Sequence, residues 1–201
     1  MRKLVLIIIV SIVSGNAFGQ LSLGVGYIKA GQFRGDANQG IYTGADFNLR
    51  IGNSFGIAPG VYYSIGKSTY PLYYSDGTVA KKYEEHYIGF PINLNYSIRL
   101  SSSVSLCVFS GPMFSYGTIS TETNVTNNSS TGKTQDLYGF LPDNVVYSPF
   151  DISFGGGLAL CFKKRVRLSL GFNFGFLNRA TGDNVHYYHR GVFHSGIAYS
   201  F

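Results

Sequence analysis

Large apolar side chains alternate with small or polar ones along most of this chain, and this alternation restricts the possible folds more than any other feature. A period of two places the two kinds of side chain on opposite faces of a β-strand. In one run, Val166, Leu168 and Leu170 alternate with Arg167 and Ser169. The same pattern recurs over residues 21–27, 45–51, 55–65, 88–100, 104–116, 152–162 and 192–201. The sequence therefore predicts an all-β fold of eight antiparallel strands.

The connections between these runs alternate between short and long. The short ones cover residues 52–54, 101–103 and 163–165. The long ones cover residues 32–40, 66–83, 117–149 and 178–189. Short turns on one side and long loops on the other are typical of an up-and-down transmembrane β-barrel. The runs are also about as long as the 9–11 residues that a tilted strand needs to cross a bilayer.

The size of the apolar side chains decides which face points outward. The interior of an eight-stranded barrel is only just wide enough to be filled by side chains, so these apolar rows cannot all lie inside. The opposite rows are rich in Gly, Ala and Ser, which suit a narrow interior. A soluble barrel of the lipocalin type would instead place its apolar row inside and a charged row outside. We therefore expect an eight-stranded antiparallel up-and-down transmembrane β-barrel whose apolar rows contact lipid.

Polar residues in the inward rows are expected to form a network inside the barrel. Ionisable side chains within a membrane span usually face the protein interior and pair with one another. The predicted lumen network comprises Asp46, Asn48, Arg50, Glu85, Asn93, Asn95, Arg99, Asp151, Arg167, Asn173, Arg190 and His194. Because side chains fill so narrow a barrel, we expect no open aqueous channel.

Two kinds of residue test the strand register. Pro59, Pro91 and Pro112 each remove a backbone donor from a predicted strand, and bulges at these points would accommodate them. Cys107 and Cys161 fall in the inward rows of neighbouring strands, so we expect them to lie close together at similar height. A cross-strand disulfide and a pair of buried free thiols remain alternatives, with free thiols slightly favoured because a small register shift forbids the bond.

The first residues have the three-part plan of a secretory signal peptide. A basic head over residues 1–3 precedes an apolar core over residues 4–13 and a small, polar stretch that ends in Ala17-Phe18-Gly19. We therefore expect a signal peptide over residues 1–19, cleaved on export, and a barrel domain over residues 20–201. The apolar core is too short to span a bilayer as a helix, which needs about 20 residues.

The last strand and one internal segment carry a family resemblance. The outward row Phe193, Ile197, Tyr199 and Phe201 ends the chain on an aromatic residue, which resembles the C-terminal signal of Gram-negative outer-membrane barrels. The segment over residues 89–96, GFPINLNY, resembles a strand motif of PorT-like barrels. With the eight-strand pattern, the chain is similar to the PorT-like and OmpX-like family. The resemblance implies insertion into outer-membrane lipid of a Gram-negative bacterium, with the last strand read by the barrel assembly machinery.

The long loops are the part in which a binding function is expected. Ser75-Asp76-Gly77-Thr78 is a tight-turn signal that makes residues 66–83 look like a β-hairpin standing above the membrane. Exposed aromatics on loops suggest a surface for a protein or another surface ligand, and packing against neighbouring loops is the alternative. The loop interaction candidates are Tyr70, Tyr73, Tyr74, Tyr138, Phe140, Leu141 and Tyr147.

Catalytic and cofactor signals are sparse. The sequence has no phosphate-binding loop, no Cys-x-x-Cys and no nucleophile elbow, and His186 and His189 with Asp183 make an incomplete metal-ligand set. The sequence contains no basic run with interleaved aromatics of the kind that would indicate nucleic-acid binding. We expect a non-enzymatic protein without a cofactor or metal, which acts as a surface interaction or structural protein. An outer-membrane lipid-modifying enzyme of the lipid A deacylase or acyltransferase type and a small-solute channel are the alternatives.

Overall fold

The computed structural model describes residues 19–31, 38–74, 77–126, 134–136, 146–181 and 189–201. The predicted signal peptide lies outside these residues, except for Gly19, which begins the first strand. Within the described ranges, no helix is long and apolar enough to cross a membrane.

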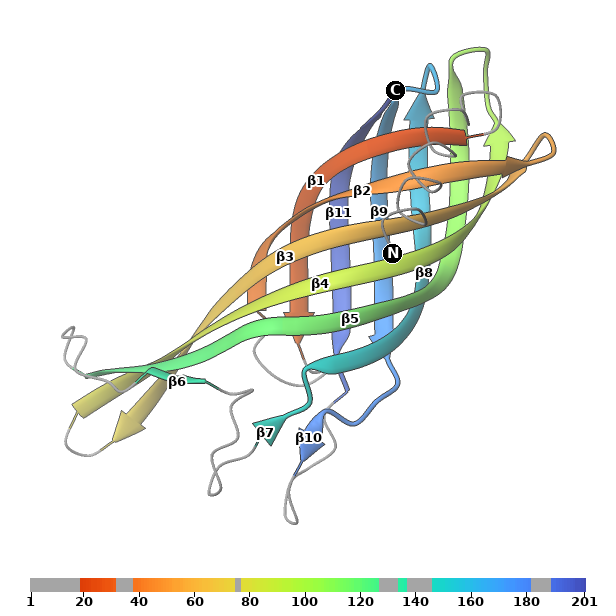
Figure 1. The fold of residues 1–201 in the computed structure, drawn as a ribbon. Helices are drawn as coiled ribbons and strands as arrows, with labels where there is room; N and C mark the ends of the chain where they lie inside the picture. Colours follow the sequence, from red (N-terminus) through yellow and green to blue (C-terminus); the bar gives the residue numbers. More distant parts are fainter. Residues whose placement is uncertain (1–18, 32–37, 75–76, 127–133, 137–145, 182–188) are drawn as a thin grey trace, which may run out of the picture.

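Eight antiparallel strands close into a barrel, as predicted (Figure 1). They are β1 (Gly19–Gly31), β2 (Asn38–Ile51), β3 (Phe55–Tyr74), β4 (Gly77–Arg99), β5 (Val104–Thr126), β8 (Phe150–Phe162), β9 (Val166–Gly175) and β11 (Gly191–Ser200). Each strand pairs with the next one in this order, and β11 returns to β1 with Ile197 opposite Val25. Closure pairs every barrel strand on both sides, so that the membrane-crossing part has no free edge.

Most strands are longer than the alternating runs that predicted them, and β3, β4 and β5 extend farthest beyond their runs. The hairpin expected over residues 66–83 forms, with Tyr74 of β3 opposite Gly77 of β4. The Thr- and Ser-rich start of the predicted loop 117–149 is instead strand, because β5 continues to Thr126 and stays paired with β4. The short strand β6 (Thr134–Asp136) adds to this part of β5, and β7 (Val146–Tyr147) pairs with β10 (Ala180–Thr181).

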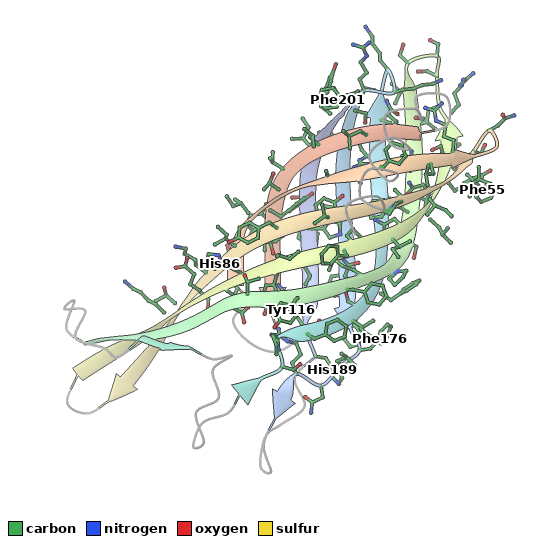
Figure 2. The ribbon with its side chains drawn as sticks, viewed as in Figure 1. Phe55, His86, Tyr116, Phe176, His189 and Phe201 are labelled. Carbon is green, nitrogen blue, oxygen red and sulfur yellow. The ribbon has the colours of Figure 1, made fainter. Side chains whose placement is uncertain are left out.

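The outward face carries a belt of large apolar side chains, as predicted. Leu23, Leu94, Leu158 and Leu170 are all at least half exposed, and they come from four different strands. Aromatic residues bound the belt at both ends: Phe55 and Phe201 lie at the short-turn end, and Tyr116 and Phe176 at the long-loop end (Figure 2). A lipid-facing apolar band between two aromatic girdles is characteristic of outer-membrane barrels.

The predicted bulges at the prolines are wrong. Beside Pro59, Pro91 and Pro112 the ladder loses some of its pairs and then resumes in the same register, so no extra residue is inserted. The missing donors are tolerated because the strands remain aligned on both sides of each gap. The register shift that the structure does show lies between His86 and Tyr87, near the long-loop end.

The two cysteines are free thiols on the inward face of neighbouring strands. Cys107 lies opposite Ala159, whereas Cys161 lies opposite Ser105, so the two are diagonal neighbours, two residues out of register. Diagonal positions on a sheet are typically about 7–8 Å apart, which is too far for ideal disulfide geometry. Of the two alternatives, the structure has the free thiols.

Candidate functional site

Aromatic side chains cross the lumen over glycines one or two strands away. The ring of Tyr42, on β2, lies against Gly26 of β1 and Gly196 of β11, where a Cβ atom would collide with it. In the same way Tyr62 lies against Gly44 of β2. These glycines have no side chain because an aromatic ring from another strand, one or two strands away, occupies the space. The Gly-rich inward rows are therefore complementary to a few inward aromatics.

These rings form one cluster near the middle of the barrel. The rings of Tyr42 and Tyr62 meet edge to face with centroids 5.6 Å apart, and Tyr42 and His194 do so at 6.3 Å. Phe109 lies 6.2 Å from His194 on the other side, over Gly157. Edge-to-face and tilted contacts at these separations are favourable for aromatic pairs.

A bidentate ion pair spans the lumen beside this cluster. Asp46 on β2 and Arg167 on β9 are separated along the barrel wall by β1 and β11. Arg167 Nη1 donates to Asp46 Oδ1 at 3.1 Å, and Arg167 Nη2 donates a shorter bond to Oδ2. The hydroxyl of Tyr62 donates to the same Oδ2 at 2.9 Å. Asp46 is only 5% exposed, so the ion pair and its hydrogen bonds are what compensate this buried charge.

The other predicted lumen residues fall into smaller groups. Asn95 donates to Asn48 at 3.4 Å, and Asn93, Asn173, His194 and Arg190 line the internal cavity. Glu85, near the long-loop end, accepts a hydrogen bond from Asn38 at 2.6 Å. Arg50 and Arg99 are exposed at the short-turn ends of their strands, and the described residues offer neither an ion-pair partner. The expectation that these two charges pair within the lumen is therefore wrong, because the strand ends reach water.

At the long-loop end, two guanidinium groups contact one tyrosine ring. Arg190 Cζ lies 3.8 Å from the ring centroid of Tyr87, and Arg179 Cζ lies 5.3 Å from it. Asp151 is 1% exposed beside them. The sequence predicted Arg190 and Asp151 as lumen residues but missed Tyr87 and Arg179. Tyr87 falls in the inward row of its strand, so the alternation of side chains could have identified it. Arg179 lies outside the predicted strands.

A second polar group lies on the outer surface of the barrel, at the long-loop rim where β2 begins. Tyr63 Oη lies 2.5 Å from His86 Nδ1, and His86 Nε2 lies 3.1 Å from Glu84 Oε1. A neutral His86 protonated on Nε2 satisfies both bonds. Lys67 contacts the other oxygen of Glu84 at 3.0 Å. The hydrogen bond from Lys67, followed by that from His86, lowers the pKa of the partly exposed Glu84 carboxyl below its usual value.

The remaining candidates lie on the outer strand extensions or beyond the described residues. Tyr70, Tyr73 and Tyr74 belong to the extension of β3, and Tyr147 belongs to β7. Tyr138, Phe140 and Leu141 lie outside the described residues. Among the described residues, no group of three or more His, Cys, Asp or Glu side chains is arranged to hold a metal ion.

Comparison with known proteins identifies the family. A family model described as "Outer membrane protein beta-barrel domain" matches residues 10–179, which is most of the chain. The chain belongs to this family. No curated protein matches the sequence of this outer-membrane barrel.

Three solved structures are similar to this outer-membrane barrel at low sequence identity. A major outer membrane protein of Thermus thermophilus has a TM-score of 0.54 and 13% identity, over 91% of this chain and 99% of that one. Neisserial surface protein A has a TM-score of 0.52 and 14% identity, over 91% of this chain and 97% of that one. Ail, the attachment invasion locus protein of Yersinia pestis, has a TM-score of 0.52 and 13% identity, over 92% of this chain and 99% of that one. At these identities the likeness establishes the fold alone.

The filled lumen leads to a prediction about conductance. We expect the purified barrel to give no steady single-channel current in planar bilayers, because the Asp46–Arg167 pair and the aromatic cluster cross its interior. A porin reconstituted in the same bilayers serves as the positive control. Reproducible single-channel steps from the pure, folded protein would contradict this prediction and favour a small-solute channel.

Proposed function

We propose that this outer-membrane barrel is a non-enzymatic surface protein that binds an extended segment of a partner along its projecting sheet. One observation carries the proposal: β3, β4 and β5 continue beyond the rim of the barrel, and one edge of this extension has no strand partner among the described residues. The last pair between β2 and β3 is Gln39 with Lys67, whereas β3 stays paired with β4 as far as Tyr74. Figure 1 shows the extension projecting from one side of the barrel.

The two edges of the projecting sheet differ. On one edge, β6 pairs with β5 over residues 121–123. On the other edge, residues 68–74 of β3 have no strand partner within the described part of the chain. An uncovered strand presents backbone donors and acceptors that an incoming extended peptide can pair with. The tyrosines Tyr70, Tyr73 and Tyr74 on this edge strand are candidates for side-chain recognition.

We also propose that this barrel is a member of the PorT-like or OmpX-like branch of outer-membrane barrels. The segment over residues 89–96 supports it, as does the outward row of the last strand. In that row Tyr199 and Phe201 meet edge to face with centroids 5.2 Å apart, and Phe201 is 70% exposed. Such an exposed terminal aromatic row suits recognition by the barrel assembly machinery, after export of the chain by the signal peptide over residues 1–19.

A truncation of the projecting hairpin tests the binding function. Residues 68–83 are replaced by an Asn-Gly turn, which joins the paired residues Lys67 and Glu84 and preserves the barrel below them. A photo-reactive amino acid at Gln39, on the last β2–β3 pair, reports the neighbours of the rim in intact cells. We expect a cross-linked surface partner with the full-length protein and its loss with the truncation. An unchanged cross-link in a truncated protein that still shows heat-modifiable mobility would contradict the proposal.

A lipid-modifying enzyme is the second candidate, because a specific contact favours it. Tyr63, His86 and Glu84 present hydroxyl, imidazole and carboxylate in the order of an activated nucleophile, its base and the group that orients the base. They lie on the outer surface at the rim, within reach of lipid headgroups. Mass spectrometry of lipid A from cells with the wild type or with His86→Gln separates the candidates. The proposed non-enzymatic function predicts identical lipid A in both.

A further inference from the structure

The long-loop end of the lumen contains an arginine whose Nε–H group has no hydrogen-bond partner within the described residues. Arg190 precedes β11 and is only 4% exposed. Its guanidinium lies over the ring of Tyr87 at 3.8 Å, and its Nε has no hydrogen-bond partner in the described part of the chain. Arg190 also lines the internal cavity. A buried N–H group without a partner is costly, so a ligand that accepts its hydrogen bond gains from it.

Ser115 supplies a second unused group on the same cavity. It lies on β5, opposite Gly89 of β4 and Asp151 of β8, and is 3% exposed. Its Oγ has no hydrogen-bond partner among the described residues, and it lines the cavity with Tyr87 and Arg190. A guanidinium and a hydroxyl thus border one space with donors that the described residues leave unused.

The charges around this end of the lumen favour an anion next to Arg190. Two guanidiniums, of Arg179 and Arg190, flank the Tyr87 ring, and Asp151 offsets one of their charges. Arg179 donates through Nε to the carbonyl of Ser148 at 3.0 Å and does not line the cavity. Of the other ionisable groups here, Glu85 accepts the hydrogen bond from Asn38, and His189 stacks on Phe174 with centroids 5.9 Å apart. Arg190 is therefore the charged group that faces the cavity at this end.

Beyond these donors the cavity has apolar and aromatic walls. Tyr42, Tyr62, Phe109 and Met113 line it, and its volume is about 130 Å³. An engineered apolar cavity of about 150 Å³ holds a benzene ring in another protein, which gives the scale of a ligand for this one. Gly89 also lines the cavity, and a Cβ atom there would meet no heavy atom closer than Met113 Sδ at 3.5 Å.

We propose that the lumen binds a small organic carboxylate with an apolar body about the size of one aromatic ring. The carboxylate accepts hydrogen bonds from Arg190 and Ser115, because a guanidinium fork matches the geometry of a carboxylate. The apolar body occupies the cavity between the aromatic side chains and Met113. This site lies inside the barrel and is separate from the projecting sheet proposed above for partner binding.

Benzoate is the probe that tests this site, and benzyl alcohol is its uncharged match. Binding to the folded, full-length mature barrel in detergent micelles is measured by calorimetry or by saturation-transfer NMR. We expect benzoate to bind at least about tenfold more tightly than benzyl alcohol, since a hydrogen bond to a charged group contributes about 1.5–3 kcal/mol. Arg190→Gln and Ser115→Ala should each weaken benzoate binding, and Arg190→Gln should do so more strongly.

Two further variants separate the site from a general charge effect. Gly89→Val fills the cavity without changing any charge, and we expect it to abolish benzoate binding. Arg50→Gln removes an exposed arginine at the short-turn end, and we expect it to leave binding unchanged. If Arg190→Gln fails to give a heat-modifiable, folded barrel, Ser115→Ala and Gly89→Val decide the matter. The absence of benzoate binding to the wild type, equal binding in Gly89→Val, or an equal loss in Arg50→Gln would overturn the proposal.

Discussion

Replacing Asp46 by alanine is expected to destabilise the folded barrel by about 3–5 kcal/mol, the usual cost of removing one partner from a buried ion pair. The guanidinium of Arg167 would keep its charge inside the lumen and lose both of its hydrogen bonds to Asp46. Tyr62 would lose the acceptor of its hydroxyl in the same step. The free energy of unfolding, measured by urea titration with gel mobility as the readout, tests this expectation.

Two matched variants show whether the buried charge is the cause. In Asp46→Ala/Arg167→Met no charge remains unpaired, so the double variant should be more stable than Asp46→Ala alone. Arg99→Gln removes an exposed arginine at the short-turn end of β4 and should change the stability by less than about 0.5 kcal/mol. If Asp46→Ala lowers the free energy of unfolding no more than Arg99→Gln does, the ion pair does not stabilise the folded barrel.

The architecture could be predicted from the sequence because the membrane and the narrow lumen impose opposite demands on the two faces of each strand. Leu168 and Leu170 must face lipid, whereas Gly171 must leave room for the ring of His194. Both requirements appear in the alternation of side chains, without any knowledge of which strands meet. The inward position of Asp46 and Arg167 follows from the same alternation.

Contacts within the lumen could not be predicted, because alternation does not determine the register. A slip of two residues between neighbouring strands keeps every side chain on its own face but changes its height. Cys107 and Cys161 show this, since both face inward as predicted and yet lie two residues out of register. The partner of Arg167 lies three strands away around the wall, so its identity depends on the accumulated stagger of the barrel.

The strand extensions beyond the rim were predicted only in part, because the sequence marks the β3–β4 turn but not the outer part of β5. The Asp-Gly turn signal indicated the β3–β4 hairpin. The outer part of β5 is rich in Thr, Ser and Asn and lacks the apolar alternation of the barrel strands. It is a strand since the neighbouring β4 supplies hydrogen-bond partners as far as the pair of Val79 with Thr126.

Replacing Gly196 by valine is expected to prevent folding of the barrel or to destabilise it by more than about 3 kcal/mol, at or beyond the upper end of the range for overpacked cores. A Cβ atom at this position would collide with the hydroxyl of Tyr42 and would lie 2.7 Å from the carbonyl oxygen of Val25. The tyrosine is held between strands in the aromatic cluster, and the carbonyl belongs to the β1 backbone, so neither can move away easily.

Gly89→Ala is the matched control, because this inward glycine has open space where Gly196 has none. Its Cβ atom would meet Met113 Sδ at 3.5 Å, an ordinary contact, so we expect a folded barrel with nearly unchanged stability. Adding Tyr42→Ala to Gly196→Val should restore only part of the stability, since the contact with the backbone of β1 remains. Heat-modifiable mobility and urea unfolding of the three variants are the measurements. Equal stability of Gly196→Val and Gly89→Ala would show that the ring of Tyr42 does not require glycine at position 196.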